Sequence, residues 1–243
     1  MLWDRDDLNR YERWLESQPG RFAIDQEYKL FERLTSAWPR RGRSVLDIGC
    51  GPGVFLNFFH QAGFDVTGLD KSPVMLAAAR ERLGCKAELR LGEASHLPFD
   101  DNSFDYTVLF TVLEFVPEPL AVLKEAARVA KHAVLVSYLN RLSLYNLAPR
   151  GRGGPLSMAA WFFPWTMRSL MRQAVGPAPI REYSVLPGPP FTWRPGLVSR
   201  ALNGFVLPLP LGGYCALSAD LNTRPLLTPL PAWPAGAQPS NTA

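Results

Sequence analysis

Short apolar runs alternate with amphipathic segments over residues 45–139, and this alternation predicts the core of the fold. Runs at 45–48, 65–69, 87–91, 104–110 and 132–139 have the pattern of buried or half-buried strands. Between them, segments 54–61, 73–83 and 119–130 have the composition and the start and stop signals of helices. Such alternation predicts an α/β fold with a doubly wound parallel sheet and right-handed crossovers.

A helical pattern precedes this sheet, over residues 4–38. Its apolar positions recur at helical spacing on both sides of an expected interruption at Pro19-Gly20. They are Tyr11, Trp14 and Leu15 before the interruption, and Ile24, Tyr28, Phe31 and Leu34 after it. We interpret the segment as a helical layer that covers the sheet.

The chain changes character after residue 140. Residues 140–200 contain eight arginines and one glutamate, and a cluster of aromatic side chains lies at 161–165. Segment 170–175 is expected to finish a helix, and 180–186 and 213–221 are expected to form two further strands. Residues 223–243 are rich in proline and are expected to be extended or disordered. The pattern therefore predicts one domain over 1–222 followed by a proline-rich tail.

Composition narrows the function classes. Hydrophobic residues make up 47% of the 243 residues, enough for a large core, and the net charge of +4 does not itself indicate nucleic acid. The three cysteines have no metal-ligand or disulfide spacing, as expected for a reducing cytoplasm. We also see no secretory signal and no apolar run long enough to cross a membrane. The expectation is a cytoplasmic protein without a metal site.

The candidate chemistry begins at V-L-D-I-G-C-G-P-G, residues 45–53. Three glycines at alternate positions follow a predicted strand and precede a predicted helix, which is the opening of a nucleotide-binding unit. The spacing differs from the G-x-G-x-x-G of dinucleotide-binding loops. Asp47, at the strand end, would repel a pyrophosphate and attract an ammonium group. This argues against a nicotinamide-dependent oxidoreductase.

A second acid follows at the next predicted strand end. Asp70 lies about twenty residues beyond the glycine loop, where nucleotide-binding folds place a carboxylate on the ribose hydroxyls. A carboxylate can accept both hydrogen bonds of a vicinal diol. Asp70 also lies next to Ser72-Pro73, the expected start of a helix, so a stabilising role at that helix end is compatible with the ribose role.

These motifs, together with E-A-S-H-L-P at 93–98 and T-V-L-E-F-V-P at 111–117, resemble class I S-adenosylmethionine-dependent methyltransferases. The resemblance is to the small-molecule type that includes ubiquinone/menaquinone biosynthesis methyltransferases. It implies a seven-stranded sheet of order 3-2-1-4-5-7-6 with the last strand antiparallel. The residues it implies for the cofactor are Asp47, Gly49, Cys50, Gly51, Gly53, Asp70, Lys71, Glu93, Ala94, Phe110 and Thr111.

Within that set the resemblance assigns the ribose to Asp70 and the adenine to Glu93 and Ala94. Phe110 and Thr111 would lie near the methionine part. Phe115 stands where many relatives have a histidine. This departure leaves a non-catalytic, cofactor-binding subunit as an alternative to an active enzyme.

The acceptor side is less defined. The resemblance implies that residues 1–43 form a lid and that an insertion at 140–210 builds the acceptor pocket. Its candidate substrate contacts are Tyr11, Trp161, Phe162 and Trp165. Arginines among aromatic residues suit a small hydrophobic or acidic acceptor, or alternatively contact with a membrane surface. No motif indicates nucleic acid as the acceptor.

No general base is assigned from the sequence. His96, Glu114 and Tyr138 are candidates by position alone. A base is needed only if the acceptor is an unionised hydroxyl, amine or carbon acid.

Overall fold

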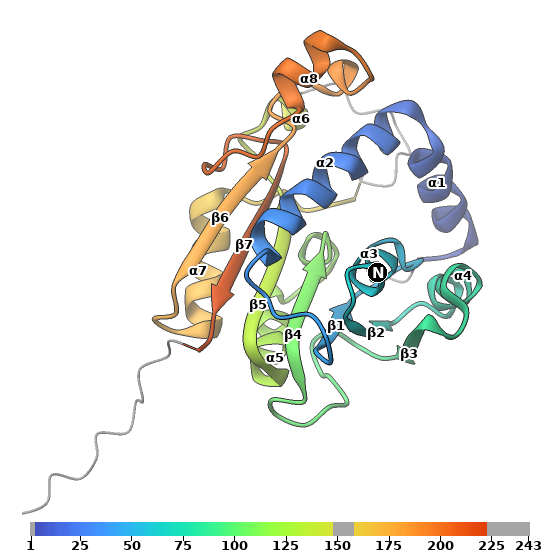
Figure 1. The fold of residues 1–243 in the computed structure, drawn as a ribbon, viewed down its shortest axis with the longest axis vertical. Helices are drawn as coiled ribbons and strands as arrows, with labels where there is room; N and C mark the ends of the chain where they lie inside the picture. Colours follow the sequence, from blue (N-terminus) through green and yellow to red (C-terminus); the bar gives the residue numbers. More distant parts are fainter. Residues whose placement is uncertain (1–2, 148–157, 223–243) are drawn as a thin grey trace, which may run out of the picture.

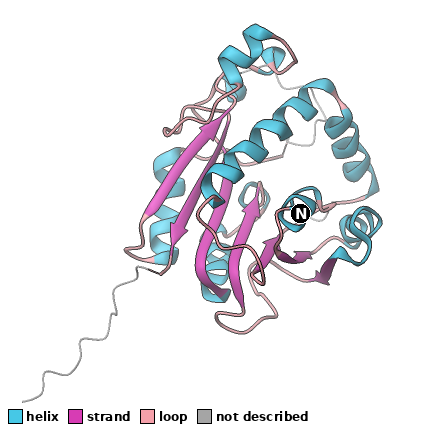
Figure 2. Cartoon of the chain, in the orientation of Figure 1, coloured by secondary structure: helices cyan, strands magenta, loops and turns pink. Residues whose placement is uncertain are grey.

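The computed structural model of the protein describes residues 3–147 and 158–222. Figure 1 shows one twisted sheet with helices on both of its faces, and Figure 2 separates the strands from the helices and loops. The proline-rich tail predicted for 223–243 lies outside the described residues.

The sheet has seven strands in the order β3-β2-β1-β4-β5-β7-β6. Strands β1 to β5 pair in parallel, and β7 is antiparallel to both β5 and β6. This confirms the predicted order and orientation. The bounds are β1 Ser44–Ile48, β2 Asp65–Asp70, β3 Ala87–Leu91, β4 Phe104–Phe110, β5 Ala130–Leu139, β6 Ile180–Val185 and β7 Tyr214–Asp220.

Helices cover the sheet on both sides. The α-helices are α1 Arg5–Glu16, α2 Gln18–Thr35, α3 Val54–Gln61, α4 Pro73–Leu83, α5 Pro119–Val129, α6 Leu144–Leu147, α7 Pro164–Val175 and α8 Leu197–Asn203. Short 3₁₀ turns are η1 Gly84–Lys86, η2 Leu113–Phe115 and η3 Pro190–Thr192. Helices α2, α3 and α4 pack on one face, and α5 and α7 pack on the other.

Each face has its own apolar core. Leu30 of α2 and Phe59 of α3 belong to the first, while Leu123 of α5 and Met171 of α7 belong to the second. All seven residues of β4 are buried, because this central strand is covered on both faces. Among the described helices, none is both long and apolar enough to cross a bilayer.

The break between α1 and α2 lies at Ser17, so the prediction of an interruption at Pro19-Gly20 was wrong by two residues. The Ser17 hydroxyl donates to the Trp14 carbonyl at 2.6 Å and accepts from the Gly20 amide at 3.1 Å. Ser17 therefore ends one helix and caps the next. Pro19 is tolerated in the first turn of α2, where its missing N–H has no intrahelical partner to lose.

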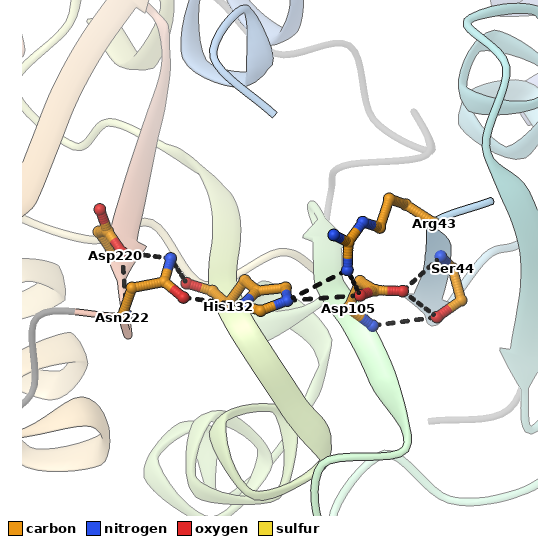
Figure 3. A network of polar contacts seen from close by, with 6 residues as sticks. All are labelled: Arg43, Ser44, Asp105, His132, Asp220 and Asn222. Atoms are coloured by element: carbon orange, nitrogen blue, oxygen red, sulfur yellow. Dashed lines mark hydrogen bonds and ion pairs between the residues drawn. The ribbon is translucent and has the colours of Figure 1, made fainter. Parts of the chain in front are cut away.

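A polar network joins four strands at the amino-terminal edge of the parallel sheet (Figure 3). The Asp105 carboxylate accepts from the Ser44 amide at 2.9 Å and from the Arg43 guanidinium at 2.8 Å. His132 lies 3.4 Å from the same carboxylate and contacts Asn222 through its other ring nitrogen at 2.7 Å. Burial opposes ionisation of Asp105, but the bonds from Ser44 and Arg43 outweigh it and lower its pKa.

Candidate functional site

A cavity of about 400 Å³ opens at the carboxyl ends of β1, β2 and β4. In a doubly wound sheet this edge is where the strand order reverses and where ligands bind. Helices α1 and α2 supply residues to the wall opposite the glycine loop. Ten of the eleven predicted cofactor residues line this cavity, namely Asp47, Gly49, Cys50, Gly51, Asp70, Lys71, Glu93, Ala94, Phe110 and Thr111.

The glycine loop curves tightly between β1 and α3. Gly49 has φ +74°, and its amide donates to the Leu69 carbonyl at 2.7 Å. A Cβ on Gly49 would lie 2.6 Å from a Val112 methyl group, so only glycine fits here without rearrangement. The Gly51 amide donates to the Asp70 carboxylate at 2.9 Å and so connects the loop to the end of β2.

Gly53 is the exception among the predicted cofactor residues, because it does not line the cavity. It has φ +77° at the N-cap of α3. A Cβ there would lie 2.8 Å from Leu83 of α4. The geometry assigns this glycine to the close packing of two helices.

Asp47 is the unusual group of the cavity. Its side chain is 1% exposed, and within the described residues neither carboxylate oxygen has a hydrogen-bond partner. Burial, with the nearby charge of Asp70 as a second cause, raises its pKa well above the ordinary value. An unpartnered buried carboxylate is costly unless a cation or a donor binds to it. Asp47 is therefore suited to an ammonium-bearing ligand.

Asp70 ends β2 with both oxygens directed into backbone turns. Its Oδ1 accepts from the Ser72 amide at 2.8 Å, while Oδ2 accepts from Gly51. Burial raises its pKa, and these backbone bonds oppose the rise. Each oxygen keeps a further lone pair, so the carboxylate can still accept from a diol in the cavity.

The remaining predicted cofactor residues lie on segments beside Asp47 and Asp70. Lys71 lies 3.9 Å from the Glu93 carboxylate, which is largely exposed. Phe110 packs against Phe55 in the cavity wall, with ring centroids 4.6 Å apart. Thr111 has φ +54°, a conformation uncommon for a residue with a side chain, and its amide donates to the Ser137 hydroxyl at 3.1 Å.

The four candidate substrate residues divide into two pairs. Tyr11 and Trp161 line the cavity, whereas Phe162 and Trp165 do not. The Phe162 amide donates to the Leu139 carbonyl at 3.0 Å, and its ring packs into the core on the α5–α7 face. Trp165 is 61% exposed and stacks on Phe163. The geometry does not support a substrate contact for these two residues.

The N-terminal segment closes one side of the cavity. The Trp3 carbonyl accepts from the Ser72 hydroxyl at 2.7 Å, and the Trp3 ring meets Phe115 edge-on with centroids 5.4 Å apart. Trp3, Tyr11 and Phe115 all line the cavity. Phe115 therefore serves as an apolar wall at the position where the family resemblance expected a histidine.

A buried polar chain lies in the same cavity, and the sequence interpretation missed it. Glu27 of α2 and Tyr214 of β7 both line the cavity. The Tyr214 hydroxyl lies 2.6 Å from the Ser137 hydroxyl and 3.4 Å from that of Thr111. Burial raises the pKa of Glu27 to about 8, and a hydrogen bond from Tyr214 partly offsets that rise.

The sequence did contain a signal for Glu27. It lies three residues after Ile24 and four before Phe31, on the helix face that packs toward the core. An acidic residue at such a position is buried, and a buried acid is either satisfied or functional.

The three earlier base candidates do not line the cavity. His96 is exposed on the loop after β3. One Glu114 oxygen accepts from the Leu139 amide at 2.7 Å, and burial raises the pKa of this carboxyl to about 8. Tyr138 donates to Glu182 at 2.8 Å. These contacts assign Glu114 and Tyr138 to structural roles around β5.

Comparison with known proteins identifies similar chains and folds. Residues 46–136 match the family model described as "Methyltransferase domain". Demethylmenaquinone methyltransferases from Staphylococcus aureus strains, among them MRSA252 and JH9, are 38% identical to the chain over 102 residues. The match covers 40% of this chain and 42% of those proteins, so it spans less than half the length of these curated relatives.

Solved structures extend the likeness over most of the chain. A Thermotoga maritima protein, described as an S-adenosylmethionine-dependent methyltransferase and possible histamine N-methyltransferase, superposes with a TM-score of 0.68 at 25% identity, covering 88% of this chain and 95% of that one. Magnesium protoporphyrin IX methyltransferase from Synechocystis PCC 6803, with bound S-adenosylmethionine, shares the fold with a TM-score of 0.59 at 16% identity over 88% of this chain and 90% of its own. By its sheet order and these likenesses, the chain has the fold of class I S-adenosylmethionine-dependent methyltransferases, and its residues 46–136 match a methyltransferase domain.

Proposed function

We propose that this protein binds S-adenosylmethionine and transfers its methyl group to a small, largely apolar acceptor. The unpartnered, buried carboxylate of Asp47 carries the proposal, because it is a site for one ammonium group at the edge where this fold binds ligands. When bound, S-adenosylmethionine supplies an electrophilic methyl group on a sulfonium, together with the ammonium that Asp47 lacks as a partner.

The other cofactor contacts follow from the positions of the side chains. Asp70 is assigned to the ribose hydroxyls, because its carboxylate ends β2 in the cavity and keeps lone pairs for a diol. Glu93 and Ala94 are assigned to the adenine, in line with the family resemblance. Lys71 also lines the cavity, 3.9 Å from the Glu93 carboxylate.

The acceptor space is apolar and aromatic. Trp161, Tyr145 and Trp193 line the cavity, and Tyr145 contacts both tryptophans, with ring centroids 4.6 Å from Trp193 and 5.1 Å from Trp161. Such walls suit a flat, ring-bearing acceptor. The name of the demethylmenaquinone methyltransferases agrees with this, since their acceptor is a quinone. Holding the two reactants in line can supply about 7–11 kcal/mol of the barrier reduction.

Glu27 is the best-placed group to receive a proton from the acceptor. Tyr214 lines the same cavity, and its hydroxyl lies 2.6 Å from that of Ser137 and 3.4 Å from that of Thr111. With S-adenosylmethionine bound, transfer would break its sulfur–methyl bond and leave S-adenosylhomocysteine, and the Glu27 carboxylate would take the proton released from the acceptor's O–H or N–H group. A base with a pKa near neutrality is well matched to this transfer.

The test has two arms. S-adenosylhomocysteine should bind with a measurable affinity by calorimetry, while NAD should not bind. Methyl-labelled S-adenosylmethionine, incubated with the protein and a host cell extract, should place label in the organic fraction. Asp70→Ala, which removes the ribose contact, should weaken the binding and reduce the label transfer. Binding without any label transfer would favour a non-catalytic subunit, and binding of NAD alone would refute the cofactor assignment.

A further inference from the structure

One end of the molecule exposes many large apolar side chains. We define the apolar rim as the exposed residues of α6, η3, α8 and the segments beside them. They are Leu142, Leu144, Leu147, Phe191, Leu197, Val198, Leu202, Phe205, Leu209 and Leu211. Phe191 is 77% exposed, Leu197 86% and Val198 80%. Apolar groups gathered in this way mark an interaction surface more often than a solvated one.

The two parts of the rim lie side by side although they are far apart in sequence. The Asn140 side-chain amide donates to the Pro210 and Gly212 carbonyls at 2.9 and 3.0 Å. Tyr145 of α6 packs against Trp193, the residue that follows η3. Figure 1 shows α6 and α8 at the same end of the molecule. The rim is therefore one continuous feature of the fold.

Helix α8 has its polarity reversed with respect to an ordinary surface helix. Its buried residues are Ser199 and Asn203, while Leu197 and Val198 face solvent. Asn203 is fully buried, accepting from the Gly188 amide at 2.8 Å and donating to the Thr192 hydroxyl at 3.0 Å. Polar side chains thus fix the helix to the protein, and its apolar residues are left outward.

The segments that form the rim carry charge of one sign. Residues 183–219 contain no aspartate or glutamate. Arg194 and Arg200 are exposed beside η3 and on α8, and Arg141 is exposed beside α6. Apolar side chains with cations among them match the interfacial layer of an anionic bilayer, where lipid tails receive the former and headgroups the latter.

The segments that form the rim also form the acceptor wall. Pro190 of η3 and Trp193, which follows η3, line the cavity, and Tyr145 lines it from α6. An acceptor dissolved in lipid would therefore meet the cavity through the same segments that contact the bilayer. This step rests on the proposed function, whereas the docking itself does not.

We propose that the apolar rim, with Arg141, Arg194 and Arg200, docks the protein on an anionic membrane surface and presents its cavity to a lipid-soluble acceptor. This differs from the expectation based on the aromatic cluster at 161–165. There Trp161 lines the cavity, and Trp165 stacks on Phe163, whose ring also contacts the Arg141 guanidinium.

The test is co-sedimentation of the purified chain, without cofactor or acceptor, with two vesicle preparations. One is phosphatidylcholine alone, and the other is equal parts phosphatidylcholine and phosphatidylglycerol. The intact chain should partition about tenfold more strongly to the anionic vesicles. The double variant Leu197→Ser/Val198→Ser should lose binding to both, and Arg194→Gln/Arg200→Gln should lose the anionic preference. All four positions are exposed, so the variants should keep the unfolding temperature of the intact chain.

Matched controls lie on other parts of the surface. Leu91→Ser changes an exposed leucine of β3, and Arg40→Gln/Arg41→Gln changes two exposed arginines before β1. Neither should alter vesicle binding. Absence of vesicle binding, equal losses in the controls, or a dimer in gel filtration that Leu197→Ser/Val198→Ser makes monomeric would overturn the proposal. Because binding of S-adenosylhomocysteine is measured separately in solution, failure here is distinguishable from failure of the proposed function.

Discussion

Replacing Asp47 by asparagine tests the central electrostatic argument, because it removes a charge and almost no volume. The carboxylate is buried at the end of β1 and has no partner among the described residues. If the cofactor's ammonium is its partner, Asp47→Asn removes a charge-assisted hydrogen bond worth about 1.5–3 kcal/mol. That corresponds to a loss of about 10- to 150-fold in affinity.

Two ligands isolate this contact. S-adenosylhomocysteine carries the ammonium, whereas 5′-methylthioadenosine keeps the adenine and ribose without the amino-acid part. Calorimetry should show that Asp47→Asn weakens the first ligand and leaves the second unchanged. Asp70→Ala should weaken both, because both carry the ribose. If Asp47→Asn weakens the two ligands equally, the carboxylate acts through the fold of the loop and the ammonium assignment is wrong.

Asp47→Asn should also change the pH dependence of unfolding in the ligand-free protein. The pKa of Asp47 is raised by burial, so the folded state binds its proton more tightly than the unfolded state does. Its contribution to stability is therefore present below the ordinary aspartate pKa and is lost as the pH rises through the raised value. Asp47→Asn should make the unfolding temperature less sensitive to pH in thermal scans and raise it at neutral pH. An unchanged pH dependence would show that the carboxylate is not desolvated.

Three further predictions test other contacts. Glu27→Gln should lower kcat by about 10²–10⁴-fold, with S-adenosylhomocysteine affinity unchanged, and should remove a rise in rate centred on a pH of about 8. Asp105→Ala should cost about 1–3 kcal/mol in urea unfolding at neutral pH, a difference that shrinks as the pH falls through the lowered pKa of Asp105. Gly53→Ala should lower the free energy of unfolding more than Gly63→Ala does. Both glycines have positive φ, but only at Gly53 would an added Cβ lie against a neighbouring helix. Equal losses of stability in the two variants would indicate backbone strain alone.

The cofactor half could be predicted from the sequence because its determinants are local. A strand, a glycine loop and a helix follow each other within residues 44–61, and Asp70 ends the next strand. In a parallel sheet all such ends meet at one edge, so the order of elements alone brings Asp47 and Asp70 together. Gly53 shows the limit of this reasoning, since a motif position can serve helix packing as readily as a ligand.

The acceptor half could not be predicted in the same way, because its contacts join distant segments. Glu27 and Tyr214 are 187 positions apart and meet only because β7 inserts between β5 and β6, below α2. The aromatic cluster was likewise ambiguous, since neighbouring residues of an extended segment face opposite ways. Trp161 consequently lines the cavity while Phe162 enters the core.

The cofactor side and the acceptor side of the cavity differ in how many substitutions they can tolerate. The donor half is constrained by backbone geometry, such as the positive φ of Gly49 and the amide bonds to Asp70, so few substitutions preserve it. The acceptor half is built from side chains on α2, β7 and the segments around α6 and η3, which can change without disturbing the sheet. The buried acid and the aromatic wall of the second half, beside the outward apolar rim, are therefore the features on which the proposed acceptor rests. They direct the search toward a lipid-soluble compound with one proton to lose.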